Sequence, residues 1–321
     1  MRRLSTVIDD YVVRVVCLVC ALCGVLALSA CSKGSSTPTP QTQGTTTTTL
    51  PQADPPSLTS AGEAPLQRLS PAMTKGDTAL IQIVTDLEVN QDSDSQLQRL
   101  DSPLVVQYIR LTVISASHSG YQLQAKIENV EVNGDETDLT EDQLSTITKE
   151  IGALKGLTTT TDFDELGRPT KFDFKSPPAM SENAKSLIGG MRAQMEMIAP
   201  SLPAEPVGVG ARWEHPVSSV DSSTGVEVSG TRTTTITAIE GTKISYEMDL
   251  ELKATSSSGG TSSEMRVESG ETTGSVTGWF DLSSPSYQLE SNTMSSLTYE
   301  IDGRRVVQDS RTTTRAKPLS E

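Results

Sequence analysis

The side chains that could carry out acid–base or nucleophilic chemistry are few in this 321-residue sequence, which has two histidines and four cysteines. His118 falls in an expected turn over residues 117–120, where a solvent-facing role is the simplest interpretation. His215 follows Trp213 in a short expected strand, where packing or hydrogen bonding is favoured over a role as general base. The chain has no histidine pair at metal-ligand spacing, no Gly-x-Ser-x-Gly motif and no phosphate-binding glycine loop. We therefore expect no enzymatic activity, no metal site and no cofactor, unless a cleft brings a histidine together with a carboxylate.

The cysteines all lie within the first 31 residues, at Cys17, Cys20, Cys23 and Cys31. This region begins with basic Arg2 and Arg3, continues through an apolar stretch over residues 15–28, and ends in small residues, as a secretory signal does. The apolar stretch is shorter than the roughly 20 residues that a membrane-spanning helix needs. We therefore predict a signal peptide over 1–30, and a remaining chain in which cysteine-based catalysis and disulfides are excluded.

The four residues Leu28-Ser29-Ala30-Cys31 resemble the lipobox of bacterial lipoproteins. The resemblance implies cleavage before Cys31 and a diacylglycerol on its thiol, often with a third acyl chain such as palmitate on the new amino terminus. Two or more acyl chains give stable anchoring, whereas one is marginal. The implied location is extracytoplasmic and membrane-anchored. By resemblance to the sorting rule of such lipoproteins, Ser32 favours the outer membrane if the host has two membranes; with one membrane, the outer face of the cell membrane is implied.

The charge balance is strongly acidic, with 41 Asp and Glu against 26 Lys and Arg, a net charge of −15. Such a surface repels nucleic acids and anionic headgroups. We expect no nucleic-acid partner, and electrostatics favour a neutral apolar ligand or a cationic partner.

Composition divides the rest of the chain into three parts. Residues 31–74 are rich in Thr, Ser and Pro, with an unbroken Thr45–Thr49 run, and are expected to be a disordered linker behind the lipidated cysteine. Residues 75–205 are expected to form a first β lobe with two helices, and residues 206–321 a second β lobe.

Period-two alternation of apolar and polar residues is the main structural signal. The clearest strand places five apolar residues on one face: Ile244, Tyr246, Met248, Leu250 and Leu252. On a second strand, which starts at Tyr121, the apolar phase slips near Asn129 and predicts a β-bulge. Turn residues predict hairpins at Gly167-Arg168-Pro169 and at Asp302-Gly303. Further strands are expected over 79–89, 104–116, 226–239, 265–271, 274–282, 287–297 and 304–314.

Two helices interrupt the strands. Thr140 and Gln143 form a capping box at the start of the first helix. The second helix, over about 181–198, carries an apolar stripe that includes Leu187, Met191 and Met195. This stripe either lines a cavity at the mouth of a half-barrel or simply completes the core.

The two halves share a pattern that suggests duplication. The segment Arg110–Ala116 followed by the Tyr121 strand parallels Arg232–Ala238 followed by the Ile244 strand. Together with residues 202–213 and the 163–169 turn, this pattern resembles bacterial surface lipoproteins that are built from a duplicated antiparallel β unit and have no known activity. In outline the chain is also similar to periplasmic lipid-carrying lipoproteins, in which a curved half-barrel holds acyl chains.

The expected fold is mainly β, with antiparallel sheets in two similar, half-barrel-like lobes and one or two covering helices. The expected function is that of a membrane-anchored, non-catalytic binding or carrier module for an apolar or amphipathic ligand such as a lipid. The alternative is a structural or protein-interaction lipoprotein of the cell envelope with no small-molecule ligand. The candidate cavity residues are Leu187, Met191, Met195, Tyr246, Met248 and Leu250, and the candidate lipidation site is Cys31.

Overall fold

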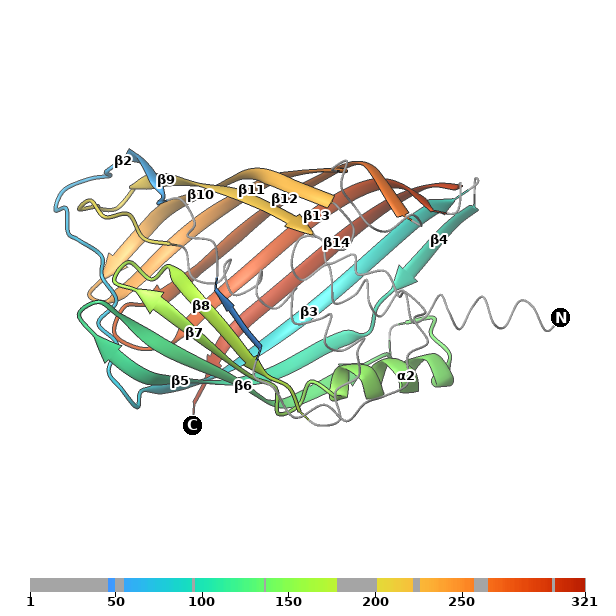
Figure 1. The fold of residues 1–321 in the computed structure, drawn as a ribbon, viewed down its shortest axis with the longest axis horizontal. Helices are drawn as coiled ribbons and strands as arrows, with labels where there is room; N and C mark the ends of the chain where they lie inside the picture. The colour runs from blue at the N-terminus through green and yellow to red at the C-terminus, as the bar shows by residue number, and fades with distance from the viewer. Residues whose placement is uncertain are drawn as a thin grey trace.

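The computed structural model describes residues 46–49, 55–93, 96–135, 137–177, 201–221, 226–256, 265–301 and 304–320. Strands dominate these ranges, and the prediction of a mainly β, antiparallel fold is confirmed (Figure 1). The strands of the first half are β1 (Thr46–Thr49), β2 (Ser57–Ser60), β3 (Thr78–Ser93), β4 (Gln96–Asp101), β5 (Leu104–Ser117), β6 (Gly120–Asn133), β7 (Thr158–Asp164) and β8 (Pro169–Lys175). Those of the second half are β9 (Arg212–Asp221), β10 (Val226–Glu240), β11 (Lys243–Ser256), β12 (Met265–Asp281), β13 (Tyr287–Ile301) and β14 (Arg304–Leu319).

All of these strands belong to one 14-stranded sheet, ordered β1-β8-β7-β6-β5-β3-β14-β13-β12-β11-β10-β9-β2, with β4 paired to β3 beside this path. The strands of the two expected lobes meet where β14 pairs with β3, so that one continuous sheet runs through both. The sheet twists and curves into an open trough (Figure 1), as large antiparallel sheets do. The half-barrel shape expected from the sequence is therefore formed by both halves together.

The two edges of the sheet are both formed by the segment expected to be a disordered linker. β1 pairs with β8 at one end of the strand order, and β2 pairs with β9 at the other. Farther along this segment, Leu69 is fully buried. The structure thus differs from the expectation in these parts of 31–74. The physical reason is that β-branched threonines suit strands, and that backbone groups at a sheet edge gain hydrogen bonds there without needing apolar side chains.

The concave face carries the apolar residues that the alternation predicts. On β11, Tyr246 and Met248 are buried, while Glu247 between them and Asp249 after Met248 are exposed. Cross-strand partners point to the same side of a sheet, so one row crosses it through Ile83, Ala316, Leu289, Gly278 and Tyr246. All members of this row except Gly278 belong to the largest buried cluster, which also contains Phe172 of β8. The cluster thus contains residues from strands of both halves of the sheet.

The predicted bulge near Asn129 is confirmed. Tyr108 pairs with Asn129 and Ile109 with Ile127, which leaves Glu128 as the extra residue on β6. Its carboxylate accepts a 2.7 Å hydrogen bond from Arg110 Nε. That bond and the charge of the guanidinium hold the pKa of Glu128 below its ordinary value, although partial desolvation opposes the shift.

The equivalent turns of the two halves are held in a similar way. Asp164 Oδ1 accepts hydrogen bonds from the backbone N–H groups of Leu166 and Arg168, both at 2.9 Å. Asp281 Oδ1 accepts a 2.8 Å bond from the N–H of Ser283. In each half an aspartate at the end of a strand thus satisfies the backbone of the following turn, as Asx turns do.

The helix α2 (Glu141–Gly152) begins with the predicted capping box, in which the Thr140 side chain accepts from the Gln143 N–H and Gln143 accepts from the Thr140 N–H. Ile147 and Ile151 on its apolar stripe pack into the largest cluster. The helix predicted over 181–198 lies outside the described residues. In the part of the chain that is described, no helix is both long and apolar enough to cross a membrane.

Candidate functional site

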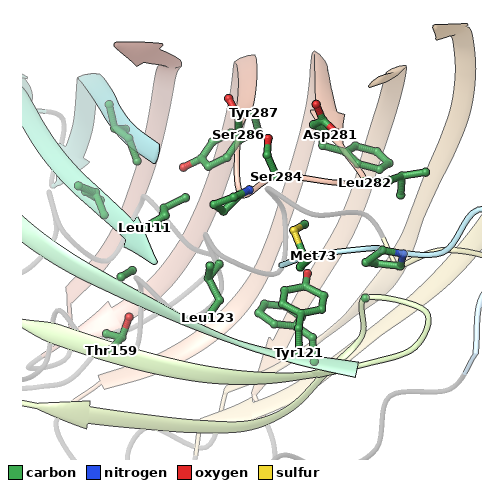
Figure 2. Close-up of a pocket in the computed structure, with 18 of the residues that line it drawn as sticks. Met73, Leu111, Tyr121, Leu123, Thr159, Asp281, Leu282, Ser284, Ser286 and Tyr287 are labelled. Carbon is green, nitrogen blue, oxygen red and sulfur yellow. The ribbon is translucent and has the colours of Figure 1, made fainter. Parts of the chain in front are cut away.

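A pocket of about 130 Å³ lies inside the trough, between β5, β6 and β7 on one side and the turn that joins β12 to β13 on the other (Figure 2). Most of its lining is aliphatic or aromatic. The lining residues are Pro71, Met73, Ile83, Ile109, Leu111, Tyr121, Leu123, Ala125, Ile127, Leu157, Thr159, Phe163, Gly167, Leu202, Phe280, Asp281, Leu282, Ser284, Pro285, Ser286 and Tyr287.

The first wall follows from strand alternation. On β6, Tyr121, Leu123 and Ala125 point to the concave side, since they lie two residues apart. The register places Tyr121 opposite Phe163 and Ala125 opposite Thr159 on β7. The Tyr121 and Phe163 rings stack, with centroids 4.8 Å apart and planes inclined by 13°. This wall is therefore flat and rigid at its aromatic end.

The second wall is the turn between β12 and β13, from which Leu282, Ser284, Pro285 and Ser286 line the pocket. Its N–H and carbonyl groups are fixed by neighbours: Leu282 N donates to Thr242 O at 2.8 Å, and Leu282 O accepts from Ala72 N at 2.6 Å. Asp281 also accepts from the hydroxyl of Ser283 at 2.8 Å. Burial opposes ionisation of Asp281, but these hydrogen bonds and the charge of Lys243 hold the pKa of its carboxyl below the ordinary value.

The third contribution comes from the segment before β3. Pro71 and Met73 both line the pocket, and Figure 2 shows the Met73 thioether between Tyr121 on one wall and the turn residues on the other. The hydrogen bond between Ala72 and Leu282 attaches this segment to the second wall. A flexible thioether in this place can adapt its shape to different apolar groups.

The phenols of the site remain protonated over a wide pH range. Burial, together with the nearby Asp164 carboxylate, raises the pKa of Tyr121 well above its ordinary value. Burial also raises the pKa of Tyr287, and the neighbouring Tyr246 adds to this effect. Both groups therefore act as neutral hydrogen-bonding groups.

Comparison with known proteins identifies no family for this chain. No protein-family model and no curated protein matches the sequence. Among solved structures, lipovitellin, described for its lipid–protein interactions, is similar with a TM-score of 0.41 and 11% identity over 77% of this chain. This chain spans only 25% of that lipovitellin chain.

Two outer-membrane proteins are also similar in structure. OprG from Pseudomonas aeruginosa has a TM-score of 0.21 and 6% identity, covering 78% of this chain and 99% of its own. The COG4313 outer membrane channel from Pseudomonas putida F1 has a TM-score of 0.22 and 10% identity, covering 78% of this chain and 97% of its own. At these scores the likenesses assign no activity to this chain.

The sequence-predicted cavity residues lie in different places. Tyr246 and Met248 are buried in the largest cluster, next to the pocket, and the Tyr246 ring lies 5.7 Å from that of Phe280, which lines it. Leu250 belongs to a second cluster with Val228. The three residues are not part of the lining of this pocket. Leu187, Met191, Met195 and the lipidation site Cys31 lie outside the described residues.

The two histidines differ in their exposure to solvent. His118 is exposed in the turn between β5 and β6, and His215 is buried on β9 opposite Arg232. Within the ranges that the structure describes, no group of three or more His, Cys, Asp or Glu residues could hold a metal ion.

The pocket residues are not recognisable as a group in the amino-acid sequence. The alternation of Tyr121, Leu123 and Ala125 indicates a single strand. What the sequence did not show was that these segments face each other, with Met73 between them.

Proposed function

We propose that this protein is a non-catalytic binding or carrier module for an apolar or amphipathic ligand, and that the apolar part of the ligand occupies the pocket between β5–β7 and the β12–β13 turn. We further propose that the chain is exported and anchored through lipid on Cys31, which would hold this pocket at a membrane outside the cytoplasm. In a host with two membranes, the anchoring membrane would be the outer membrane. In a host with one membrane, the protein would be anchored to the outer face of the cell membrane.

The observation that carries the proposal is the apolar lining of the pocket. A cavity of about 130 Å³ is close in size to an engineered protein cavity of about 150 Å³ that stays dry and binds benzene. Transfer of each methylene group from water into such a lining contributes roughly 0.8 kcal/mol. The pocket therefore suits a short section of an acyl chain or one ring of a larger ligand.

The chemistry of the lining supports a role without catalysis. Its polar groups are hydroxyls and the Asp281 carboxylate, and Asp281 is engaged by Ser283. Neither His118 nor His215 borders the pocket. A nucleophile with an adjacent base, which covalent catalysis requires, is not present among these lining residues.

Native mass spectrometry of residues 32–321 tests the binding role. This chain contains all described residues, and we expect it to retain a lipid-sized additional mass under mild conditions. The variant Ala125→Phe fills the pocket from β6 and should lose that mass. Gln124→Phe adds the same ring to the same strand on the outer face and should keep it, with circular dichroism as the check on folding.

An unliganded mass for the wild-type chain would contradict the carrier role and would favour a structural or protein-interaction lipoprotein. The anchor is tested separately by detergent phase partition of the full chain made in its own host. The wild-type chain should enter the detergent phase and Cys31→Ala should not; equal partition into the aqueous phase would contradict the anchor.

A further inference from the structure

The pocket has several polar groups and no positive charge. Of its lining residues, all of which are described, none is Lys, Arg or His, and Asp281 is the one with a formal charge. Five of them carry hydroxyl groups: Tyr121, Thr159, Ser284, Ser286 and Tyr287. The lining thus offers hydrogen bonds but no counter-ion for an anion.

The carboxylates beside the pocket each have a cation near them, and neither of these cations lines the pocket. On the second wall, hydrogen bonds from Ser283 favour the ionised form of Asp281. On the first wall, Asp164 lies at the end of the same strand as Phe163, and its Oδ2 accepts a 2.6 Å hydrogen bond from Arg168 Nε. The nearest cation to Asp281 in the strand register is Lys243, whose ammonium lies 4.3 Å from the centroid of the Trp279 ring. An anion in the pocket would therefore meet the Asp281 carboxylate and no cation among the lining residues.

These features separate ligands by charge. Burial of an unpaired carboxylate or phosphate in an apolar site is strongly unfavourable, whereas a neutral carbonyl or hydroxyl needs only one or two hydrogen bonds. Tyr121 lies on one wall, and Tyr287, Ser284 and Ser286 lie on the other (Figure 2). Their hydroxyls are placed to donate to an ester carbonyl that enters between the walls.

From this geometry we propose that the ligand is an uncharged lipid, with an ester, hydroxyl or comparable neutral polar group beside the acyl chain, and that the pocket selects against fatty-acid carboxylates and anionic phospholipids. This inference rests on the proposed function, because it names the ligand class of the same pocket. The net negative charge of the protein also disfavours anionic lipids, since it repels their headgroups at longer range.

Three probes with the same eight-carbon chain length test the inference on residues 32–321: methyl octanoate, octanoate and octylammonium at neutral pH, where the carboxylate and the amine are charged. Binding is followed through the methyl NMR signals of Leu111 and Leu123, which line the pocket. We expect methyl octanoate to shift these signals and to bind about tenfold or more tightly than octanoate. Equal or tighter binding of octanoate, or tightest binding of octylammonium, would overturn the inference while leaving an apolar-ligand pocket in place. If none of the probes shifts these signals, the proposed function itself fails.

A charge-insertion variant tests the cause. Ser284→Lys places a cation in the pocket wall, and we expect the preference for methyl octanoate over octanoate to fall by about tenfold or to reverse. Gln288→Lys adds the same charge at an exposed position four residues away and should leave the preference unchanged. An unchanged preference in Ser284→Lys, with a wild-type circular dichroism spectrum, would show that charge does not control selection.

Discussion

Tyr121 and Phe163 face each other across β6 and β7, and their rings stack with centroids 4.8 Å apart. At the neighbouring residue pair, whose side chains point to the opposite face, Gln122 Nε2 donates to Asp162 Oδ1 at 2.7 Å. The strand pair is thus fixed on both faces at the same level. This explains how a strand of only seven residues, β7, can support one wall of a pocket.

Removal of one member of the aromatic pair should destabilise this wall. We expect Phe163→Ala to lower the free energy of unfolding by about 3–5 kcal/mol, because a buried ring and its stacking contact are lost. Thr160→Ala, on the outer face of the same strand, should cost less than about 1 kcal/mol. Urea unfolding followed by circular dichroism measures both. Equal effects of the two variants would show that the stacked pair is not the stabilising element.

The buried phenols predict a loss of stability in alkali. Burial raises the pKa of Tyr121, Tyr246 and Tyr287 above the ordinary value of 10.0. In the unfolded chain these groups ionise from about pH 10, while in the folded chain they stay neutral. Their contribution to stability is therefore complete below about pH 10 and is lost as pH rises above it.

Unfolding free energies measured at increasing pH should accordingly fall above about pH 10, and the variant Tyr287→Phe should fall less steeply. The phenolate absorbance of the folded protein should lag behind that of the urea-unfolded protein. If both forms develop phenolate absorbance together, the phenols are not buried as described.

Two glycines of β12 provide a matched test of backbone spacing in the sheet. A Cβ at Gly278 would overlap the backbone carbonyl oxygen of Gln288 on β13, whereas a Cβ at Gly274 would lie 3.2 Å from Asn292 O. We expect Gly278→Ala to cost about 1–3 kcal/mol and Gly274→Ala clearly less. Thermal unfolding of the two variants compares them directly. A larger loss for Gly274→Ala would contradict the spacing of β12 and β13.

The capping box of α2 should be worth a measurable amount. Thr140→Ala removes the side-chain acceptor for the Gln143 N–H and should destabilise the helix by about 1 kcal/mol. Thr146→Ala removes the same atoms from an exposed site in the same helix and should cost less. Amide hydrogen exchange over residues 141–152 reports the local effect. Faster exchange in Thr146→Ala than in Thr140→Ala would argue against the cap.

The elements that the sequence predicted are those in which local chemistry decides the structure. The alternation around Tyr246 predicted the two faces of β11, the phase slip predicted the bulge at Glu128, and Thr140 with Gln143 predicted the start of α2. In each case the signal and the structure lie within a few residues of one another.

The arrangement of the pocket depended on pairings between distant segments. Tyr121 and Tyr287 come together only because β5, β3 and β14 lie in order between β6 and β13. Likewise Met73 lies between the walls because Ala72 bonds to Leu282, more than two hundred residues later in the chain. No periodicity within one strand contains this information, and strand order is set by the energy of the whole sheet.

The place of β1 at the edge of the sheet limits how far the body can lie from a membrane. Covalent geometry allows at most about 3.4 Å per residue, so the chain between Cys31 and Thr46 can span no more than about 50 Å. A linker that ran as far as residue 75 would allow roughly 150 Å. A lipid held at Cys31 would therefore keep the trough within a short reach of the bilayer surface, at a distance where a ligand could pass between the two without travelling far through water.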